Sequence, residues 1–231
     1  DVEASVAQCL KVAAAGAKLI RLTTQGLKEV EALKEIKRKL HEANCNVPLV
    51  ADVHFTSEVA IAAAAVADKV RINPGNFAKD HDEAKIRFAE FLKVCREHNT
   101  AVRIGLNHGS LGERITTLYG NSPLGMKEAA MEWIKMALDL NFRNIVVSLK
   151  ASNTVVMVSA YRLLNEAMKR ENINFPIHLG VTEAGNGDEG RIKSAVGIGT
   201  LLNEEIGDTI RVSLTEEPVN EIIAGNIIAD H

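Results

Sequence analysis

The segment VRINPGN, residues 70–76, places an arginine inside a run of branched aliphatic residues and then breaks the run with Asn-Pro-Gly-Asn. Branched aliphatic residues favour a β-strand, and the Pro-Gly pair favours a turn. One interpretation is a solvated edge strand that ends in an ordinary turn. The other is a strand whose last residues, Arg71 and Asn73, contact a ligand. The other strands of the chain distinguish between these interpretations.

Seven short segments are almost continuously apolar and rich in β-branched residues, as expected for parallel strands that are covered on both faces. Amphipathic helical patterns lie between them, among them residues 27–43, 82–98, 125–140 and 155–171. Strands that alternate with helices of this length predict βαβ units with right-handed crossovers. The predicted strands are residues 18–24, 48–55, 69–75, 101–107, 144–152, 176–184 and 209–215.

The chain opens with a predicted helix, DVEASVAQCLKVAAAGA, that Asp1 caps. In a β/α alternation the first helix follows a strand, so we expect an eighth strand before Asp1. This pattern predicts an α/β fold, a TIM (β/α)8 barrel whose first strand is missing from this chain, and a single domain over residues 1–231. A doubly wound open sheet is the alternative, because alternation alone does not separate the two folds.

The composition excludes several classes of protein. A hydrophobic fraction of 46% with 25% charged residues is ordinary for a globular protein. The net charge of −3 and the lack of basic runs argue against nucleic acid as a partner. No apolar run reaches the roughly 18 residues that a membrane span needs. We therefore expect neither a nucleic-acid nor a membrane partner.

The three cysteines, Cys9, Cys45 and Cys95, are far apart and form no C-x-x-C pair. This spacing argues against a disulfide framework and against a complete metal or cluster site within the chain. Cys9 and Cys95 lie in helical patterns, where we expect them to be small buried residues. A reducing cytoplasm fits this use of cysteine.

Polar residues occur late in each predicted strand and are mostly two positions apart. Because side chains alternate between the two faces of a strand, residues i and i+2 share one face. In a barrel the outer face meets the helices, so the polar set points inward, at the carboxyl ends where TIM-barrel active sites lie. The set includes Arg21 and Thr23, Asp52 and His54, Arg71 and Asn73, Arg103 and Asn107, Ser148, Lys150 and Ser152, His178 and Thr182, and Arg211 and Ser213.

Five cations in this set come from five different strands, and Asp52 and Glu183 are the anions nearby. Burying several cations together without counter-charges costs on the order of several kcal/mol for each cation. A bound anion removes this cost. The planar fork of arginine matches phosphate oxygens. We therefore expect a substrate with two or more phosphoryl groups. The alternative is that each arginine pairs with a carboxylate of a helix or loop and is structural.

Two Gly-rich segments follow strands. Residues 105–126 form a long predicted loop that is either a lid or a flexible excursion. Residues 182–202 place glycines just before a helix, where backbone N–H groups can hold phosphate, although helix packing explains these glycines as well. His54, His108 and His178 are placed near the predicted site, and each is alternatively a core histidine.

Together these segments closely resemble the barrel domain of the 4-hydroxy-3-methylbut-2-enyl diphosphate synthase family, the iron–sulfur enzymes of the methylerythritol phosphate pathway of isoprenoid biosynthesis. The likeness runs in order from Asp1 to about Pro218, and GLNHGSL and GDEGRIKSAVGIGTLL are more similar to the long three-domain form than to the two-domain form. The segments that carry it are DVEASVAQ, VPLVADVHF, VRINPGN, RIGLNHGSL, SLKASN, IHLGVTEAG and RIKSAVGIGTLLNEEIGDTIRVSLTEEP.

The resemblance implies an oxidoreductase whose substrate is 2-C-methyl-D-erythritol 2,4-cyclodiphosphate. It implies that the cations of the barrel mouth bind the diphosphate, and that ring opening and loss of water occur at a [4Fe-4S] cluster. The candidate catalytic residues are Asp52, His54 and Glu183, although proton transfer is not assigned to any one of them. The candidate substrate-binding residues are Arg21, Arg71, Asn73, Arg103, Asn107, Lys150, Ser152, His178, Arg211 and Ser213.

The chain also departs from the family pattern. The cluster ligands of the family, three cysteines and a glutamate, belong to a C-terminal domain that is absent here, as is the inserted domain of the long form. The cofactor is therefore expected in the full-length enzyme only, and this chain is expected to bind substrate weakly at best and not to turn over alone. The implied electron donor is ferredoxin or flavodoxin. A second copy in a homodimer is a further candidate partner, and the sequence leaves the oligomeric state open. The implied location is the cytoplasm of a bacterium or the plastid stroma of a plant.

Two other functions remain open at this point. One is a phosphosugar aldolase-like barrel enzyme in which Lys150 forms a Schiff base. The other is a non-catalytic module that binds anions while a partner supplies the chemistry.

Overall fold

The computed structural model describes residues 1–54, 56–78 and 80–230. Phe55, which ends the predicted strand 48–55, lies outside the described residues, as does His231. The chain divides into two compact units. The first contains Asp1–Arg103 and Ala137–Asn144, and the second contains Ile104–Met136 and Ile145–His231. Each unit is described by itself.

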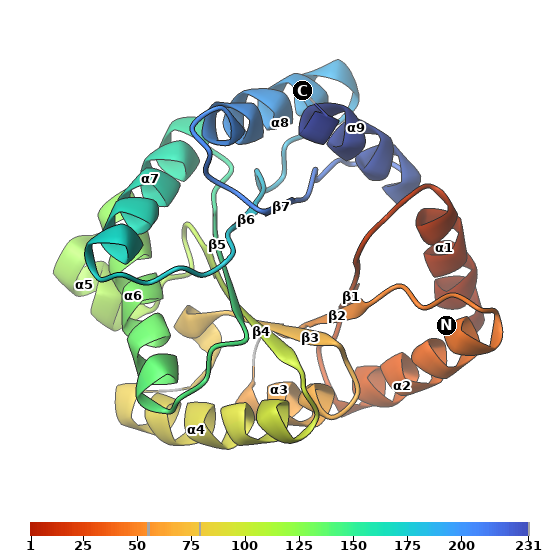
Figure 1. Ribbon diagram of the computed structural model, residues 1–231, viewed down its shortest axis with the longest axis horizontal. Helices are drawn as coiled ribbons and strands as arrows, with labels where there is room; N and C mark the ends of the chain where they lie inside the picture. Colours follow the sequence, from red (N-terminus) through yellow and green to blue (C-terminus); the bar gives the residue numbers. More distant parts are fainter. Residues whose placement is uncertain (55, 79, 231) are drawn as a thin grey trace. The chain divides into compact units, whose positions relative to one another are not determined.

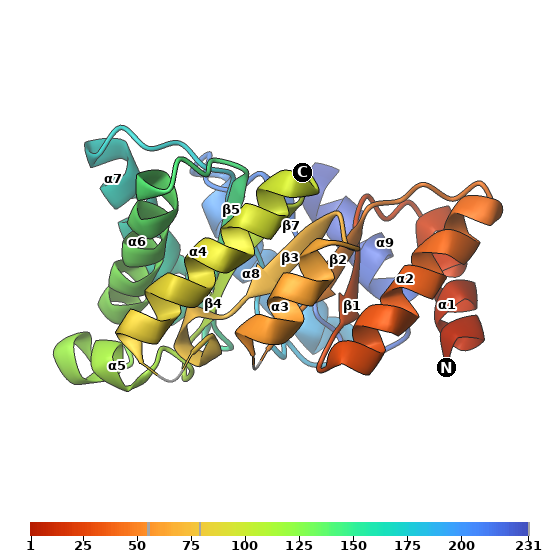
Figure 2. The same cartoon turned by 90° about the horizontal axis from the view of Figure 1, so that it is seen from below.

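The first unit is a parallel sheet covered by helices. Strands β1, β2, β3 and the start of β4 are neighbours in sequence order. Figures 1 and 2 show α2, α3 and α4 side by side on one face of these strands. The elements are α1 (Val2–Ala14), β1 (Ile20–Thr23), α2 (Leu27–Glu42), β2 (Leu49–Asp52), α3 (Ser57–Ala64), β3 (Lys69–Ile72), the 3₁₀ turn η1 (Pro74–Asn76), α4 (His81–Glu97) and β4 (Ala101–Asn107).

Helices α1, α3 and α4 each begin at a capping side chain, whereas α2 begins after Gly26 without one. Asp1 accepts hydrogen bonds from the N–H groups of Glu3 and Ala4 at 3.0 and 3.3 Å, as predicted for the opening helix. Asp80 accepts one from Glu83 N at 2.8 Å at the start of α4. Helix α2 buries the residues of its three- and four-residue spacing, which are Val30, Leu33, Ile36 and Leu40.

The second unit has the same alternation of strands and helices. Figure 1 shows α7 and α8 on one side of its strands. Strands β6 and β7 pair over two residues each, and isolated parallel bridges continue the pairing at Val147 with Ile177 and at Ala151 with Val181. Its elements are the end of β4, α5 (Glu113–Tyr119), α6 (Pro123–Asp139, which ends in the first unit), β5 (Ile145–Lys150), α7 (Thr154–Arg170), β6 (His178–Leu179), α8 (Gly187–Leu202), β7 (Thr209–Ile210) and α9 (Pro218–Asp230).

Each of the seven predicted strands contains an observed strand. The segments 176–184 and 209–215 are regular over only two residues each, because bridges and single hydrogen bonds replace a continuous ladder. Within the described units neighbouring strands follow sequence order, without the reversal that defines a doubly wound sheet. The sheet order therefore favours the barrel over its alternative.

The long loop predicted over residues 105–126 is in part helical. This segment contains α5, whose Ile115 is buried, and α6 begins at Pro123. His108 Nε2 lies 3.0 Å from the carbonyl oxygen of Asn121, and Gly109 N donates to Asn121 Oδ1 at 2.8 Å, so the ends of the excursion are joined. The lid interpretation stays a prediction.

The two glycines of the GIG segment differ in their surroundings. A Cβ added to Gly197 would lie 2.8 Å from Val181 Cγ2 and 3.2 Å from Met157 Sδ, whereas no atom lies within 4 Å of a Cβ added to Gly199. Helix α8 therefore packs closely against α7 and the segment after β6 at Gly197. Helix packing, the alternative explanation of this glycine, is confirmed at that position.

We predict that Gly197→Ala lowers the free energy of unfolding by about 1–3 kcal/mol, because the added methyl group overpacks the interface. The matched control is Gly199→Ala in the same helix, which should raise it by roughly 0.5–1 kcal/mol, since alanine favours a helix interior over glycine. Chemical denaturation measures both. Equal effects of the two substitutions would contradict the packing described here.

Candidate active site

The carboxyl ends of β1, β2 and β3 bring three polar residues into one row. In the parallel ladder Thr23 stands opposite Asp52, and Asp52 stands opposite Arg71. Residues that face each other in a parallel ladder project to the same side of the sheet, and Arg21 shares this side because it is two residues before Thr23. The predicted i, i+2 pattern therefore produces a cluster on one face of the first unit.

Asp52 is the centre of this cluster and is completely buried. Arg71 Nη1 donates a hydrogen bond to Asp52 Oδ1 at 2.9 Å, and Arg21 Nη1 forms an ion pair with Asp52 Oδ2. His54 Nε2 lies 3.3 Å from Asp52 Oδ1. One carboxylate therefore holds two guanidinium groups and an imidazole in place.

The protonation state of Asp52 follows from these contacts. Burial by itself raises the pKa of this carboxyl group, but the hydrogen bond from His54 and the charges of Arg71 and Arg21 outweigh burial. The pKa of Asp52 is consequently held well below its ordinary value. The carboxylate stays ionised throughout the physiological pH range.

Arg71 is itself 4% exposed, and its strand β3 lies between β2 and β4. The interpretation of VRINPGN as a solvated edge strand was therefore wrong. The break after β3 is a 3₁₀ turn over Pro74–Asn76, and the buried side chain of Asn73 accepts a hydrogen bond from Gly75 N at 3.2 Å. Asn73 thus shapes the turn, and its predicted contact with a ligand stays a prediction.

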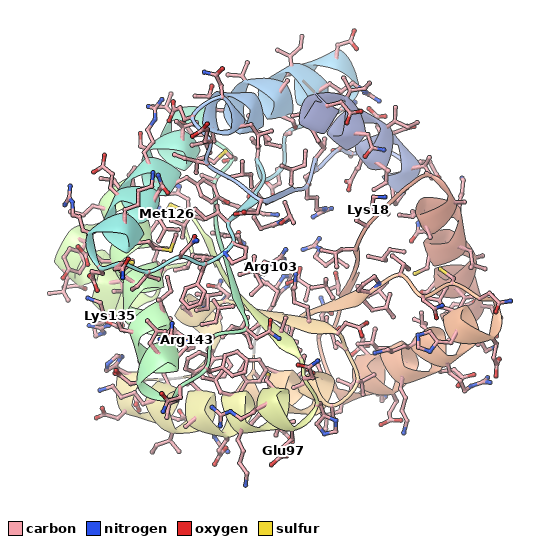
Figure 3. All side chains as sticks on the ribbon, viewed as in Figure 1. Lys18, Glu97, Arg103, Met126, Lys135 and Arg143 are labelled. Atoms are coloured by element: carbon pink, nitrogen blue, oxygen red, sulfur yellow. The ribbon has the colours of Figure 1, made fainter. Side chains whose placement is uncertain are left out.

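Arg103 adds a further buried cation to the first unit, at 6% exposure. Figure 3 labels it on the side of β4 away from α4, whereas Glu97 of α4 points away from the sheet. Lys69 lies on the same face of β3 as Arg71, and its pKa is lowered by burial and then by the charge of Arg103. Lys69 is not among the predicted site residues, although its position two residues before Arg71 is a signal that it shares this face.

In the second unit, the candidate residues at the ends of β4 and β5 lie on neighbouring strands. His108 N, directly after Asn107, donates to Lys150 O at 2.8 Å. Ser152 is exposed, and the next residue, Asn153, caps α7 by accepting hydrogen bonds from the N–H groups of Val155 and Val156. Lys150 therefore ends β5 two residues before Ser152 and close to the start of α7.

The segment after β6 contains the most unusual backbone of the site. Glu183 has a φ of 51° and is exposed. The other five described residues with positive φ that are not glycine each follow the end of a helix, where this conformation is common. Such a conformation costs about 1–3 kcal/mol in a residue with a side chain and concentrates at functional sites. The backbone thus supports Glu183 as a candidate.

His178 and Thr182 lie on the same strand segment as Gly180. His178 is 7% exposed, and its Nδ1 lies 2.8 Å from Thr209 Oγ1. A core histidine has the same surroundings, so the predicted substrate contact of His178 stays a prediction. The Oγ1 atom of Thr182 is buried and has no hydrogen-bond partner within residues 1–54, 56–78 and 80–230.

Arg211 has a carboxylate partner on α9. Its Nε and Nη2 atoms lie 3.3 and 3.3 Å from Glu221 Oε2, and Glu221 Oε1 also accepts a hydrogen bond from Leu214 N at 3.1 Å. At this one arginine the structure matches the alternative in which a helix carboxylate neutralises the charge. Ser213, two residues later, is half-buried.

The amino end of α8 is occupied by a carboxylate of the chain. Glu216 accepts hydrogen bonds from Gly187 N at 2.7 Å and from Arg191 Nη1 and Nη2 at 2.7 and 2.8 Å. These contacts lower the pKa of Glu216 to about 2, and the hydrogen bond from Arg191 has the largest effect. The backbone N–H group of Gly187 therefore binds Glu216. The sequence had suggested a bound phosphate at this end of the helix.

The cysteines do not form a ligand set. Cys9 and Cys95 are buried in α1 and α4, which confirms the expectation for both. Burial raises the pKa of both thiols, to about 12 for Cys95. Across the part of the chain that the structure describes, no three His, Cys, Asp or Glu side chains could hold a metal ion, so these residues do not fit an iron–sulfur cluster.

No described helix is both long and apolar enough to cross a membrane.

Residues 1–226 match a family described as the GcpE TIM-barrel domain. A protein of Bacteroides fragilis (strain YCH46), named 4-hydroxy-3-methylbut-2-en-1-yl diphosphate synthase (flavodoxin), is 50% identical over 248 aligned residues, which cover 100% of this chain and 40% of that protein. A protein of Synechococcus sp. (strain CC9902), named as the ferredoxin form, is 49% identical over 96% of this chain and 60% of its own length. A chloroplastic ferredoxin form of Oryza sativa subsp. japonica is 47% identical over 96% of this chain and 32% of its own length.

Solved structures with the same fold are more distant in sequence. A dihydropteroate synthase of Coxiella burnetii in complex with pteroic acid has a TM-score of 0.59 and 12% identity, over 99% of this chain and 85% of that chain. A dihydropteroate synthase of Anaplasma phagocytophilum has a TM-score of 0.58 and 11% identity, over 99% of this chain and 90% of that chain. At these identities the likeness shows the fold alone. With the family match it confirms the predicted TIM barrel, while the strand before Asp1 stays a prediction.

The chain spans less than two thirds of the length of these curated relatives, 40% in the Bacteroides protein and 60% in the Synechococcus protein. Its identity to the longer and to the shorter relative is nearly equal, at 50% and 49%. The resemblance to the long three-domain form therefore stays a prediction.

We predict that Asp52→Asn lowers the free energy of unfolding at neutral pH by roughly 3–5 kcal/mol, because it removes the negative charge that the buried Arg71 and the half-buried Arg21 contact. The ionised carboxylate stabilises the fold above its ordinary pKa of 3.8, and this contribution is lost as the pH falls toward the lower pKa of the folded state. The unfolding free energy of the unsubstituted protein should therefore fall more steeply below pH 4 than that of the variant (~4 being the ordinary pKa of a carboxyl group).

Denaturation at a series of pH values makes this comparison. The control is Glu35→Gln, which removes an exposed partner of Arg38 on α2 and should change stability little. Parallel pH profiles for Asp52→Asn and the unsubstituted protein would contradict the assignment.

Proposed function

Because the chain belongs to the GcpE TIM-barrel domain family, we propose that it is the substrate-binding barrel of a 4-hydroxy-3-methylbut-2-en-1-yl diphosphate synthase. The whole enzyme is then an oxidoreductase of isoprenoid biosynthesis. It opens the ring of 2-C-methyl-D-erythritol 2,4-cyclodiphosphate with two electrons and removes one oxygen as water. Relatives with this name that align with the whole chain support the proposal. We also propose that residues 1–231 form one barrel domain, since β4 runs through both compact units.

The observation that carries the proposal is the Asp52 cluster, which consists of Asp52 and its partners Arg21, His54 and Arg71. Arg21 and Arg71 both contact Asp52, and Arg103 adds a third guanidinium group in the same unit. A guanidinium has five N–H donors, so an ion pair with a carboxylate is compatible with binding phosphate oxygens on the same group. In the described part of the first unit these three guanidinium groups accompany the buried carboxylate of Asp52, and several cations suit a diphosphate, which carries several negative charges.

In this proposal the residues of the first unit bind the diphosphate and stabilise the charge that develops on it. Ring opening transfers an electron pair to a phosphate oxygen, and fixed cations placed in advance favour that step. Asp52 holds the imidazole of His54 through Nε2, which orients it as a candidate proton donor or acceptor. Glu183, held by its unusual backbone, is the other candidate for proton transfer.

In the second unit, the proposed contacts with substrate come from the ends of β4 to β7. In a TIM barrel the active site draws side chains from the carboxyl ends of several strands. In this proposal the hydroxyl and amide groups of this set form hydrogen bonds with the substrate, and its two cations attract the negative charge of the substrate. These residues are Asn107, Lys150, Ser152, His178, Arg211 and Ser213.

The redox cofactor is proposed to be bound outside this chain. The cysteines described above do not fit a [4Fe-4S] cluster, which would supply the electrons when bound by the rest of the enzyme. The electron donor is proposed to be ferredoxin or flavodoxin, the two proteins that the names of the relatives contain. The proposed location is the cytoplasm of a bacterium or, as for the chloroplastic relative, the plastid stroma of a plant.

The aldolase-like alternative with a Schiff base on Lys150 is not favoured, because the relatives that align with the whole chain are named as synthases of a diphosphate. The anion-binding module differs from the proposal in one measurable way. A module that only captures anions binds inorganic pyrophosphate as tightly as the cyclic diphosphate, whereas a substrate site distinguishes them by the carbon skeleton.

We predict that Arg71→Ala and Arg103→Ala each weaken binding of the cyclic diphosphate by roughly 10- to 150-fold, about 1.5–3 kcal/mol, which is typical of hydrogen bonds to charged groups. Titration calorimetry on the purified protein measures this, with circular dichroism to show that each variant is folded. The control is Arg96→Ala on α4. The exposed guanidinium of Arg96 donates to Leu140 O, directly after α6, and its loss should leave affinity unchanged. Normal affinity in either site variant, or equal affinity for pyrophosphate and the cyclic diphosphate, would contradict the proposal.

A further inference from the structure

Lys150, Gly180 and Arg211 stand side by side on three adjacent strand segments of the second unit. Ala151 bridges Val181, so the preceding residues Lys150 and Gly180 are neighbours. Leu179 pairs with Ile210, so the following residues, Gly180 and Arg211, are neighbours as well. Residues at one level of a parallel sheet project to the same face. Two cations therefore flank a glycine.

The side chain of Lys150 lies across this glycine. A Cβ added to Gly180 would be 3.0 Å from Lys150 Cε, 3.0 Å from Lys150 Nζ and 3.0 Å from the carbonyl oxygen of Arg211. The end of the lysine side chain thus lies directly against the position where any other residue would carry its Cβ. Adjacent strands are about 4.8 Å apart, so this path carries the ammonium from β5 over the next strand segment, toward β7.

We propose that Gly180 is a positioning residue for Lys150. The missing side chain leaves a gap on the strand face between His178 and Thr182, and the ammonium of Lys150 lies in that gap. Gly180 thereby sets how close the cation of β5 comes to the cation of β7. The part of this inference that concerns ligand binding rests on the proposed function, in which both cations contact the substrate.

A purely structural role for Gly180 makes a different prediction. The carbonyl oxygen of Arg211 is as close to the added Cβ as the lysine is, and a backbone atom moves less readily than the end of a flexible side chain. If this oxygen alone excludes a side chain, alanine at position 180 disturbs the strand and leaves Lys150 where it is. Substituting Gly180 with and without the lysine separates the two roles.

The experiment compares four proteins: unsubstituted, Gly180→Ala, Lys150→Ala and the double variant. Lys150→Ala removes both lysine atoms that would lie 3.0 Å from the added Cβ. Protein with ¹³C-labelled lysine gives a Cε signal for Lys150, which is assigned by its absence in Lys150→Ala. We expect this signal to shift in Gly180→Ala without ligand. We also expect Gly180→Ala to weaken binding of the cyclic diphosphate about 10-fold or more, as loss of a charged contact does, and to have no further effect in the Lys150→Ala background.

Three results would overturn the proposal: an unmoved Lys150 signal in Gly180→Ala, unchanged affinity in that variant, or the same loss of affinity with and without Lys150. Should Gly180→Ala fail to fold, the double variant decides. Recovery of the fold supports a clash with the lysine, and failure of both supports the carbonyl of Arg211 and overturns the proposal. If the unsubstituted protein does not bind the cyclic diphosphate, the proposed function fails, while the lysine signal still tests the positioning role.

Discussion

A single buried carboxylate, Asp52, determines how the first unit can place its cations. Two arginines and a histidine contact it, and the residues opposite it in the ladder are fixed by the register of three parallel strands. Without that carboxylate the burial of Arg71 at 4% exposure would be strongly unfavourable. Because a slip of one residue would turn Asp52 toward the helices, the ion pairs and the register support each other.

This arrangement connects the fold with the proposed chemistry. A sheet of short parallel strands offers few positions per strand, and only the last ones face a site at its carboxyl edge. The chain uses these positions for basic and hydroxyl-bearing residues, and it uses small residues where a neighbour must pass, as Lys150 does over Gly180. The outer faces carry the aliphatic residues that pack on the helices.

Much of the arrangement could be predicted from the sequence, because strand alternation is a strict geometric rule. The rule by itself places Asp52, Arg71 and His54 on one face at the strand ends, and the ladders confirm that these strands run parallel. It could not identify the partners that come from helices and loops, since those depend on tertiary packing. Glu221 on α9 reaches Arg211, and Glu216 fills the amino end of α8, where a pattern of glycines had suggested phosphate. Helix α5 was missed because its flanking glycines are typical of loops.

The protonation state of Asp52 in the folded protein tests this arrangement most directly. The ¹³C signal of its carboxyl carbon, followed by NMR as the pH is lowered, reports the pKa of this group in the folded protein. We expect Asp52 to remain ionised well below the ordinary pKa of 3.8 until the protein unfolds. A midpoint at or above the ordinary pKa would show that the arginines do not neutralise this carboxylate, and would contradict the arrangement on which the proposed binding of a diphosphate depends.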